Sequence, residues 1–219
     1  MTKRHPLFIT LEGGEGSGKS TQARLLAGRL RAAGHDVCLT QEPAGTAVGK
    51  LIKGVFERRA ARAGPPITPF AELFLFEAAR ADHVRTVIRP ALEAGRIVVC
   101  DRFADSTLAY QGHGRGLPLD EVRRLNQIAT EGLTPDLTLL LDLPPETGLA
   151  RANATHEAGA KHRDALGEET LDFHRRVREG FLAIAHAEPA RVLIIDATQP
   201  EAAVAEVVWI AVQRLLPPP

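Results

Sequence analysis

The chain has 219 residues, 44% of them hydrophobic, which is enough to bury one α/β core and little more. Its 27 lysines and arginines balance 27 aspartates and glutamates, so a net charge of zero offers no polybasic field to nucleic acid or anionic lipid. No apolar run approaches the length of a membrane span, and two cysteines cannot build a disulfide framework. We therefore expect one soluble cytoplasmic domain, residues 1–219, without nucleic-acid or membrane partners.

The first predicted elements surround a phosphate-loop motif. The apolar run 7–11 predicts a strand, and residues 13–20 read Gly-Gly-Glu-Gly-Ser-Gly-Lys-Ser. A helix should follow, because apolar residues recur at i, i+3, i+4 and i+7 from Ala23 to Leu30. Glycines in such a loop let successive N–H groups point at one anion, in front of the positive end of the helix. A glycine-rich turn with a surface lysine is the alternative, but strand, loop and helix all agree with the motif.

Each residue of the loop has an expected role. Lys19 would reach the outer phosphates of a nucleoside triphosphate, and the Ser20 hydroxyl would ligate magnesium. The other expected ATP-binding residues are Gly13, Gly14, Glu15, Gly16, Ser17, Gly18 and Thr21.

The rest of the chain alternates short apolar runs with helical stretches. Apolar runs that predict strands covered on both faces are 37–41, 97–100, 137–141 and 192–195. Helices are expected near 46–58, 69–93, 119–132, 145–153 and 168–187, and after Pro200. The pattern predicts an α/β fold, a doubly wound parallel sheet of five strands flanked by helices. Cys38 and Cys100 lie in runs that look like central strands, which suits reduced thiols.

Polar residues gather at the predicted strand ends. The phosphate loop, Glu42-Pro43, Asp101-Arg102 and Asp142 all fall at carboxyl ends, where ligands bind in open α/β sheets. Asp101 offers a carboxylate to magnesium or its waters, and Arg102 offers a guanidinium to phosphate. A surface ion pair between these two neighbours is the alternative.

Residues 153–167 lack a clean period and are small, polar and charged. We interpret them as a mobile lid, with a passive surface connection as the alternative.

A phosphate loop indicates a nucleotide but not a reaction. The chain has neither the Asn-Lys-x-Asp guanine motif of GTP-binding switches nor the Leu-Ser-Gly-Gly-Gln signature of transporter ATPases, which leaves small kinases. Phosphoryl transfer requires a site that holds two anions close together, neutralises their charge and excludes water.

Several further motifs together resemble the bacterial thymidylate kinase family, from Phe8 to beyond Thr198. They are Leu11-Glu12-Gly13 with Glu15, Gln-Glu-Pro-Ala-Gly-Thr at 41–46, Phe-Glu-Ala-Ala-Arg at 76–80, Asp-Arg-Phe at 101–103, Ser-Thr-Leu-Ala-Tyr-Gln-Gly at 106–112, Pro-Asp-Leu-Thr at 135–138 and Asp-Ala-Thr at 196–198. The resemblance implies a magnesium-dependent, usually homodimeric P-loop kinase that moves the γ-phosphate of ATP onto dTMP.

The resemblance also implies how the acceptor base is bound. Phe76 would stack on thymine, Arg80 would donate to its O4, and Thr107 with Gln111 would face the polar edge of the ring. Core packing is the alternative for Phe76, which lies at helical spacing from other apolar residues. A solvated charge is the alternative for Arg80 and for Glu15.

For the sugar and the phosphate, the family implies further contacts. Tyr110 would pack against the deoxyribose and exclude a 2′-hydroxyl, while Glu15 would accept from the 3′-hydroxyl. Lys53 stands where the family usually has an arginine that grips the acceptor phosphate, and it lacks that bidentate fork. The remaining expected substrate contacts are Glu42, Pro43, Arg102 and Ser106.

In the lid, the family pattern is incomplete. Its Asp-Arg pair appears as Asp164-Ala165, so the catalytic cation is either Arg163, one place early, or Arg151. Alternatives for the whole chain are another nucleoside monophosphate or deoxynucleoside kinase, and a nucleotide-binding switch protein.

Overall fold

The computed structural model describes residues 6–60, 67–157 and 169–216. They contain a five-stranded parallel sheet of order β2-β3-β1-β4-β5, which confirms the predicted doubly wound sheet. The strands are β1 (Phe8–Glu12), β2 (Val37–Gln41), β3 (Ile97–Asp101), β4 (Leu137–Asp142) and β5 (Val192–Asp196).

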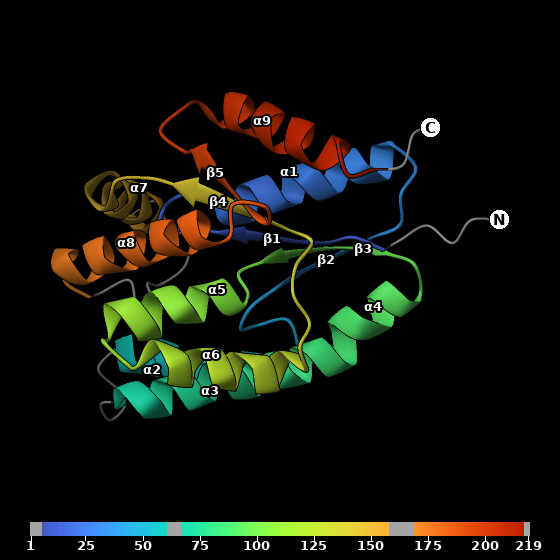
Figure 1. The fold of residues 1–219 in the computed structure, drawn as a ribbon. Coiled ribbons are helices and arrows are strands. Elements are labelled where there is room, and N and C mark those ends of the chain that lie inside the picture. Colours follow the sequence, from blue (N-terminus) through green and yellow to red (C-terminus); the bar gives the residue numbers. More distant parts are fainter. Residues whose placement is uncertain (1–5, 61–66, 158–168, 217–219) are drawn as a thin grey trace.

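Helices cover both faces of the sheet (Figure 1). One face carries α1 (Lys19–Ala32) and α9 (Glu201–Gln213), which pack against each other. On the opposite side lie α3 (Pro69–His83), α4 (Arg89–Glu93), α5 (Ala104–Thr107), α6 (Leu119–Thr130) and α8 (Leu171–Ala187). Two further helices pack on members of this group, α2 (Ala47–Ala60) on α3 and α7 (Pro145–Glu157) on α8. Within the described part of the chain, no helix is both long and apolar enough to span a membrane.

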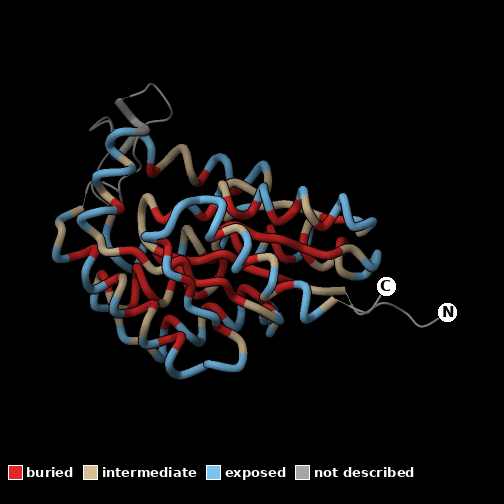
Figure 2. The backbone as a smooth tube through the Cα atoms, turned by 90° about the horizontal axis from the view of Figure 1, so that it is seen from above, coloured by how far each residue is buried: buried red, intermediate tan, exposed pale blue. Residues whose placement is uncertain are grey.

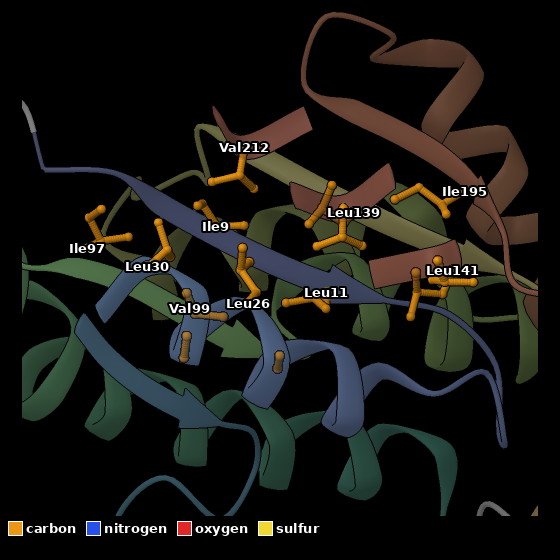
Figure 3. Packing of buried hydrophobic residues seen from close by; sticks show 14 of the residues in the cluster. Ile9, Leu11, Leu26, Leu30, Ile97, Val99, Leu139, Leu141, Ile195 and Val212 are labelled. Carbon is orange, nitrogen blue, oxygen red and sulfur yellow. The ribbon is translucent and has the colours of Figure 1, made fainter. Parts of the chain in front are cut away.

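The core is continuous through the central strands, which appear as buried segments through the middle of the molecule (Figure 2). Every residue of β1 and β3 is buried. On one face, Ile9 and Leu11 pack with Leu26 and Leu30 of α1 in a single cluster (Figure 3). The alternate residues of β1 and β3 face a second cluster under α4. Burial on both faces explains the unbroken apolar runs of these strands.

The two edge strands depart from the expectation that both faces are covered. In β5, Leu193 and Ile194 are about two-fifths exposed, because this strand lies at the end of the sheet. Cys38 lies on β2, the other edge, and is half-buried, so the prediction that both cysteines lie in central strands holds only for Cys100.

The stretch expected as one helix over 69–93 is divided into three. Between α3 and α4, residues Val84–Ile88 form a π-helical turn, η1, whose last bond runs from the N–H of Arg89 to the carbonyl of Val84. Pro90 has no N–H and cannot donate a helical hydrogen bond. The wider π-helical turn before it accommodates this missing bond.

A helical segment from 104 to 114 was not expected. It consists of α5 and a second π-helical segment, η2 (Leu108–Gly114), in a region whose glycines disfavour helix. At the other end of the chain, α7 runs to Glu157, four residues beyond the expected boundary, so residues 153–157 of the expected lid are helical. Residues 158–167 of that lid lie outside the described residues.

Candidate active site

The phosphate loop, residues 13–20, links β1 to the first turn of α1 at the carboxyl edge of the sheet. Gly16 has a φ of 66° and Gly18 a φ of 91°, a backbone conformation that other residues rarely adopt. A Cβ on Gly16 would also collide with the carbonyl oxygen of Gly148 in α7. The predicted bend of the loop is therefore confirmed, and it requires glycine at both positions.

Lys19 is buried at the start of α1, where its ammonium group lies against the loop. Its Nζ donates to the carbonyl oxygen of Gly14 at 2.6 Å and to Oγ of Ser17 at 3.2 Å. Burial, reinforced by the positive charge of Arg102, lowers the pKa of Lys19 to about 8. An anion in front of the loop would restore its full charge, so this lysine is poised for a phosphate ligand.

Ser20 and Asp101 meet between α1 and the end of β3. The Ser20 hydroxyl donates to Oδ2 of Asp101. The other carboxylate oxygen, Oδ1, is buried and has no hydrogen-bond partner among the described residues. A hydroxyl and a carboxylate oxygen side by side are the kind of oxygen ligands that Mg²⁺ prefers. These residues therefore fit a magnesium ion carried by a nucleotide.

Arg102 follows β3 with a φ of 71° and reaches back to the phosphate loop. Its guanidinium donates to Glu15 at 2.8 Å and to Oγ of Ser106 at 3.2 Å, and it lies 5.0 Å from the centre of the Tyr110 ring. Burial acts to lower its pKa, but Tyr110 and Glu15 outweigh this and raise the pKa. Because Asp101 is buried and bonded to Ser20, the alternative of a surface ion pair between Asp101 and Arg102 is wrong.

Glu15 lies between cations rather than in solvent. It accepts from Arg102 and, at 3.1 Å, from the Tyr110 hydroxyl. Burial acts to raise its pKa, but the charges of Arg102 and Lys19 outweigh burial and lower the pKa. Glu15 is therefore a carboxylate held in place beside the loop, and its side chain is only 26% exposed.

Glu12 is a buried glutamate that the sequence marks only by its place in a motif. It accepts from the backbone N–H of Phe103 at 2.7 Å and from the Ser106 hydroxyl at 2.6 Å. Complete burial and the negative charge of Asp105 raise its pKa to about 8. Glu12 thereby ties the end of β1 to the segment that carries Arg102.

Phe76 of α3 lines the cavity beside the loop and also packs on its neighbours. Its ring stacks on Phe56 of α2, with centroids 4.6 Å apart and planes 6° apart. Phe56 is buried and was missed, although Ile52 and Phe56 have the spacing of one helix face. Core packing, the alternative for Phe76, is therefore present, and stacking on thymine stays a prediction.

Arg80 is 2% exposed, so the alternative of a solvated charge is wrong. Its Nε donates to Oε2 of Glu42, Nη2 forms an ion pair with the same oxygen, and Nη1 donates to Glu77 and Asn126. Nη2 also donates to the carbonyl of Phe103 at 3.2 Å. Each of the three guanidinium nitrogens therefore donates to at least one protein acceptor. Donation to a base oxygen therefore competes with these protein contacts.

Lys53, expected to grip the acceptor phosphate, lines the cavity from α2. Its ammonium group pairs with Glu57 one turn later at 2.9 Å, and its side chain is 35% exposed. The pair holds Lys53 at the surface of the cavity, where a phosphate could compete with Glu57.

Only one of the two candidate lid arginines lies in the described part of the chain. Arg151 of α7 donates to the carbonyl oxygen of Ala197, just beyond β5, at 2.9 Å. Arg163 lies outside the described residues. The structure therefore leaves the choice between these arginines open.

The predicted residues largely share one cavity of about 1460 Å³ at the carboxyl ends of the strands. The residues expected from sequence that line it are Glu15, Gly16, Ser17, Gly18, Lys19, Ser20, Thr21, Glu42, Pro43, Lys53, Phe76, Arg80, Asp101, Arg102, Ser106, Thr107, Tyr110, Gln111 and Arg151. Gly13 and Gly14 belong to the loop but do not line the cavity. The phosphate loop and the expected base contacts thus face the same space.

Comparison with known proteins identifies the family. The family model described as thymidylate kinase matches residues 11–208. The chain belongs to the thymidylate kinase family.

Individual relatives match over nearly their whole length. The chain is 55% identical over 211 residues to the thymidylate kinase of a Synechococcus species, strain JA-2-3B'a(2-13), covering 96% of each chain. It is 52% identical over 208 residues to the thymidylate kinase of Deinococcus radiodurans, covering 95% of this chain and 97% of the other. A crystal structure of thymidylate kinase from Ehrlichia chaffeensis superposes with a TM-score of 0.72 at 32% identity, covering 94% of this chain and 98% of the other.

Proposed function

We propose that this chain transfers the γ-phosphoryl group of ATP to dTMP, giving dTDP and ADP. The observation that carries this proposal is the single cavity shared by the phosphate loop and by Phe76, Arg80 and Gln111. Its volume exceeds the range of about 300–1,000 Å³ that is typical for one small ligand, as a site for two nucleotides requires. Family membership over residues 11–208 supports the same acceptor.

The donor side uses the loop. Backbone N–H groups of residues 13–20 and the Lys19 ammonium hold the phosphates of ATP at the start of α1. Ser20 and Asp101 would hold the magnesium ion, which when bound neutralises phosphate charge. Arg102 lies between the loop and the acceptor side, where its permanent charge stabilises the transferring group.

The acceptor side uses residues of α2, α3, α5 and η2, together with Glu15 of the loop. Phe76, backed by Phe56, gives thymine a flat apolar contact, and Tyr110 packs against the deoxyribose. Glu15, bonded to the Tyr110 hydroxyl, accepts from the 3′-hydroxyl.

Lys53 exchanges its ion pair with Glu57 for one with the acceptor phosphate, and Thr107 with Gln111 faces the polar edge of the base. No covalent intermediate is needed, since transfer is in line.

The competing proposal is a nucleotide-binding switch protein, which hydrolyses ATP without an acceptor. ADP release, followed with ATP and magnesium in the presence and absence of dTMP, separates the two. We expect release to depend on dTMP. Equal rates with and without dTMP would exclude the kinase.

We also propose that the chain forms a homodimer through α2, α3 and α6. Exposed hydrophobic side chains gather on these helices, which pack on one another and lie together in Figure 1: Leu51, Phe70, Phe74 and Ile128. Phe70 and Phe74 lie one turn apart, with ring centroids 6.4 Å apart. A second copy would remove this apolar surface from water.

The oligomeric state tests this proposal directly. Sedimentation should give a dimer for the wild type and a monomer for Phe74→Glu. Ile210→Glu, a matched change at an exposed apolar residue of α9, should remain dimeric. A monomeric wild type at micromolar concentration would contradict the proposal.

A further inference from the structure

Glu72 is a fully buried carboxylate on the helix that carries the expected base contacts. It precedes Phe76 by four residues and Arg80 by eight, so the three lie in one row along α3. Phe76 and Arg80 line the cavity, whereas Glu72, 0% exposed, does not. A charge so deeply buried must be compensated by partners, and their identity indicates its role.

The first partner of Glu72 is Arg115, which follows η2. The Nε and Nη2 of Arg115 donate to Oε1 and Oε2 of Glu72, both at 3.0 Å. Arg115 also pairs with Glu169 at 2.7 Å and lies over the ring of Phe173. Because an arginine occupies both oxygens, Glu72 acts as a carboxylate that only accepts hydrogen bonds.

The second partner is Gln111 on η2, whose Nε2 donates to Oε1 of Glu72 at 2.9 Å. The two ends of a glutamine amide are normally hard to tell apart, but an acceptor-only neighbour decides between them. The amino group must face Glu72, because a carbonyl oxygen there would be repelled. Gln111 itself lines the cavity, so its carbonyl oxygen is the group left to contact a ligand.

We propose that Glu72 is a positioning residue for base selection, which fixes the Gln111 amide so that its carbonyl oxygen selects pyrimidines with an N3–H. This inference rests on the proposed function. It explains why the site would accept thymine and uracil and reject cytosine. Thymine donates from N3, whereas N3 of cytosine is an acceptor and would meet the Gln111 oxygen lone pair to lone pair. A site built around a polar contact rejects a base that cannot make it.

Glu72→Gln is the direct test. The new amide can donate to Gln111 or accept from it, so the Gln111 side chain becomes free to turn its amino group toward the cavity. We expect the ratio of kcat/KM for dTMP to that for dCMP to fall about tenfold or more. Glu169→Gln is the matched control, because it changes another carboxylate partner of Arg115 and leaves the Glu72–Gln111 bond intact; its ratio should equal that of the wild type.

A swap variant keeps the test decisive if Glu72→Gln folds poorly. In Glu72→Gln/Gln111→Glu, the new amide at 72 donates to the new carboxylate at 111, whose other oxygen again accepts from N3–H. Gln111→Glu alone places two carboxylates together and should lose dTMP turnover, and the double variant should regain both turnover and the preference for dTMP.

The outcomes separate this inference from the proposed function. A wild type that does not favour dTMP would defeat the acceptor assignment. If the wild type favours dTMP, three outcomes would overturn the role of Glu72. They are an unchanged dTMP-to-dCMP ratio of kcat/KM in folded Glu72→Gln, an equal loss of kcat/KM for every acceptor, and a double variant that does not regain dTMP turnover.

Discussion

Ser20 and Asp101, 81 residues apart in the chain, are joined by a hydrogen bond from the hydroxyl to the carboxylate. The bond connects the first turn of α1 to the end of β3, so the phosphate loop and the Asp-Arg segment form one unit. Oδ1 of Asp101, which has no hydrogen-bond partner in the described part of the chain, lies in that unit, and Arg102 is the next residue. The donor and acceptor sides of the proposed reaction thus meet at a pair of neighbouring strands.

Lys19→Ala should remove most turnover while leaving the fold intact. The lysine is a buried cation whose ammonium group bonds to the loop, and losing a charge partner of the transferring group costs about 10²-fold or more in kcat. Lys50→Ala, at an exposed lysine of α2 outside the cavity, is the control and should keep wild-type rates. Steady-state kinetics with dTMP make the comparison, and normal turnover in folded Lys19→Ala would refute the role of the loop.

Glu12→Gln should change how stability depends on pH. The folded pKa of Glu12 is raised from 4.5 to about 8, so between these values the folded state retains a proton that the unfolded state has lost. Stability from this group is therefore full below about pH 4.5 and is lost as the pH rises toward 8. Glutamine imitates the protonated form and cannot ionise. As the pH rises from 4.5 to about 8, the free energy of unfolding of Glu12→Gln should increase relative to that of the wild type, as measured by chemical denaturation. If the two free energies change with pH in parallel, the effect of burial on Glu12 is contradicted.

Arg80→Ala should destabilise the fold as well as impair catalysis. It leaves the buried carboxylates of Glu42 and Glu77 without their cation, and breaking a buried pair on one side costs about 3–5 kcal/mol. Arg85→Ala removes an arginine whose side chain is 75% exposed, and should cost less than about 1 kcal/mol. Urea denaturation of both variants measures the difference. Equal losses would mean that the Arg80 network contributes no more than a surface pair.

Arg151→Ala tests the cation at the end of α7. Its bond to Ala197 places it at the cavity wall, and a cation that acts mainly in the transition state lowers kcat more than it weakens ATP binding. Arg163→Ala and the double variant should be measured beside it, with Arg175→Ala, an exposed arginine paired with Glu146, as the control. Normal turnover in the double variant would mean that Lys19 and Arg102 supply the charge without the lid.

The sequence predicted local features better than distant contacts. The phosphate loop could be predicted because strand, glycines and helix are contiguous, and the positive φ values of Gly16 and Gly18 are properties of the loop itself. The central strands could be predicted because burial on both faces leaves an apolar run.

Contacts between distant segments could not be predicted in this way. Arg80 was expected to be available for a base, but its acceptors include the residue after β2, a residue of α6 and the segment after β3, and only the folded chain brings them together. Glu72 had no signal of its own beyond its spacing from Phe76, because its role depends on Gln111 of η2 and on Arg115, which follows η2. The exposure of β5 likewise follows from its place in the strand order, which its residues do not encode.

The central claim is that one cavity serves ATP and dTMP, and acceptor specificity tests it most directly. The measurement is kcat/KM for dTMP, dUMP, dCMP and dGMP with ATP and magnesium, followed by ADP release and by identification of the diphosphate product. We predict that dTMP gives the highest kcat/KM and is converted to dTDP, with dCMP and dGMP far below it. A preference for dGMP or dCMP over dTMP would contradict the account.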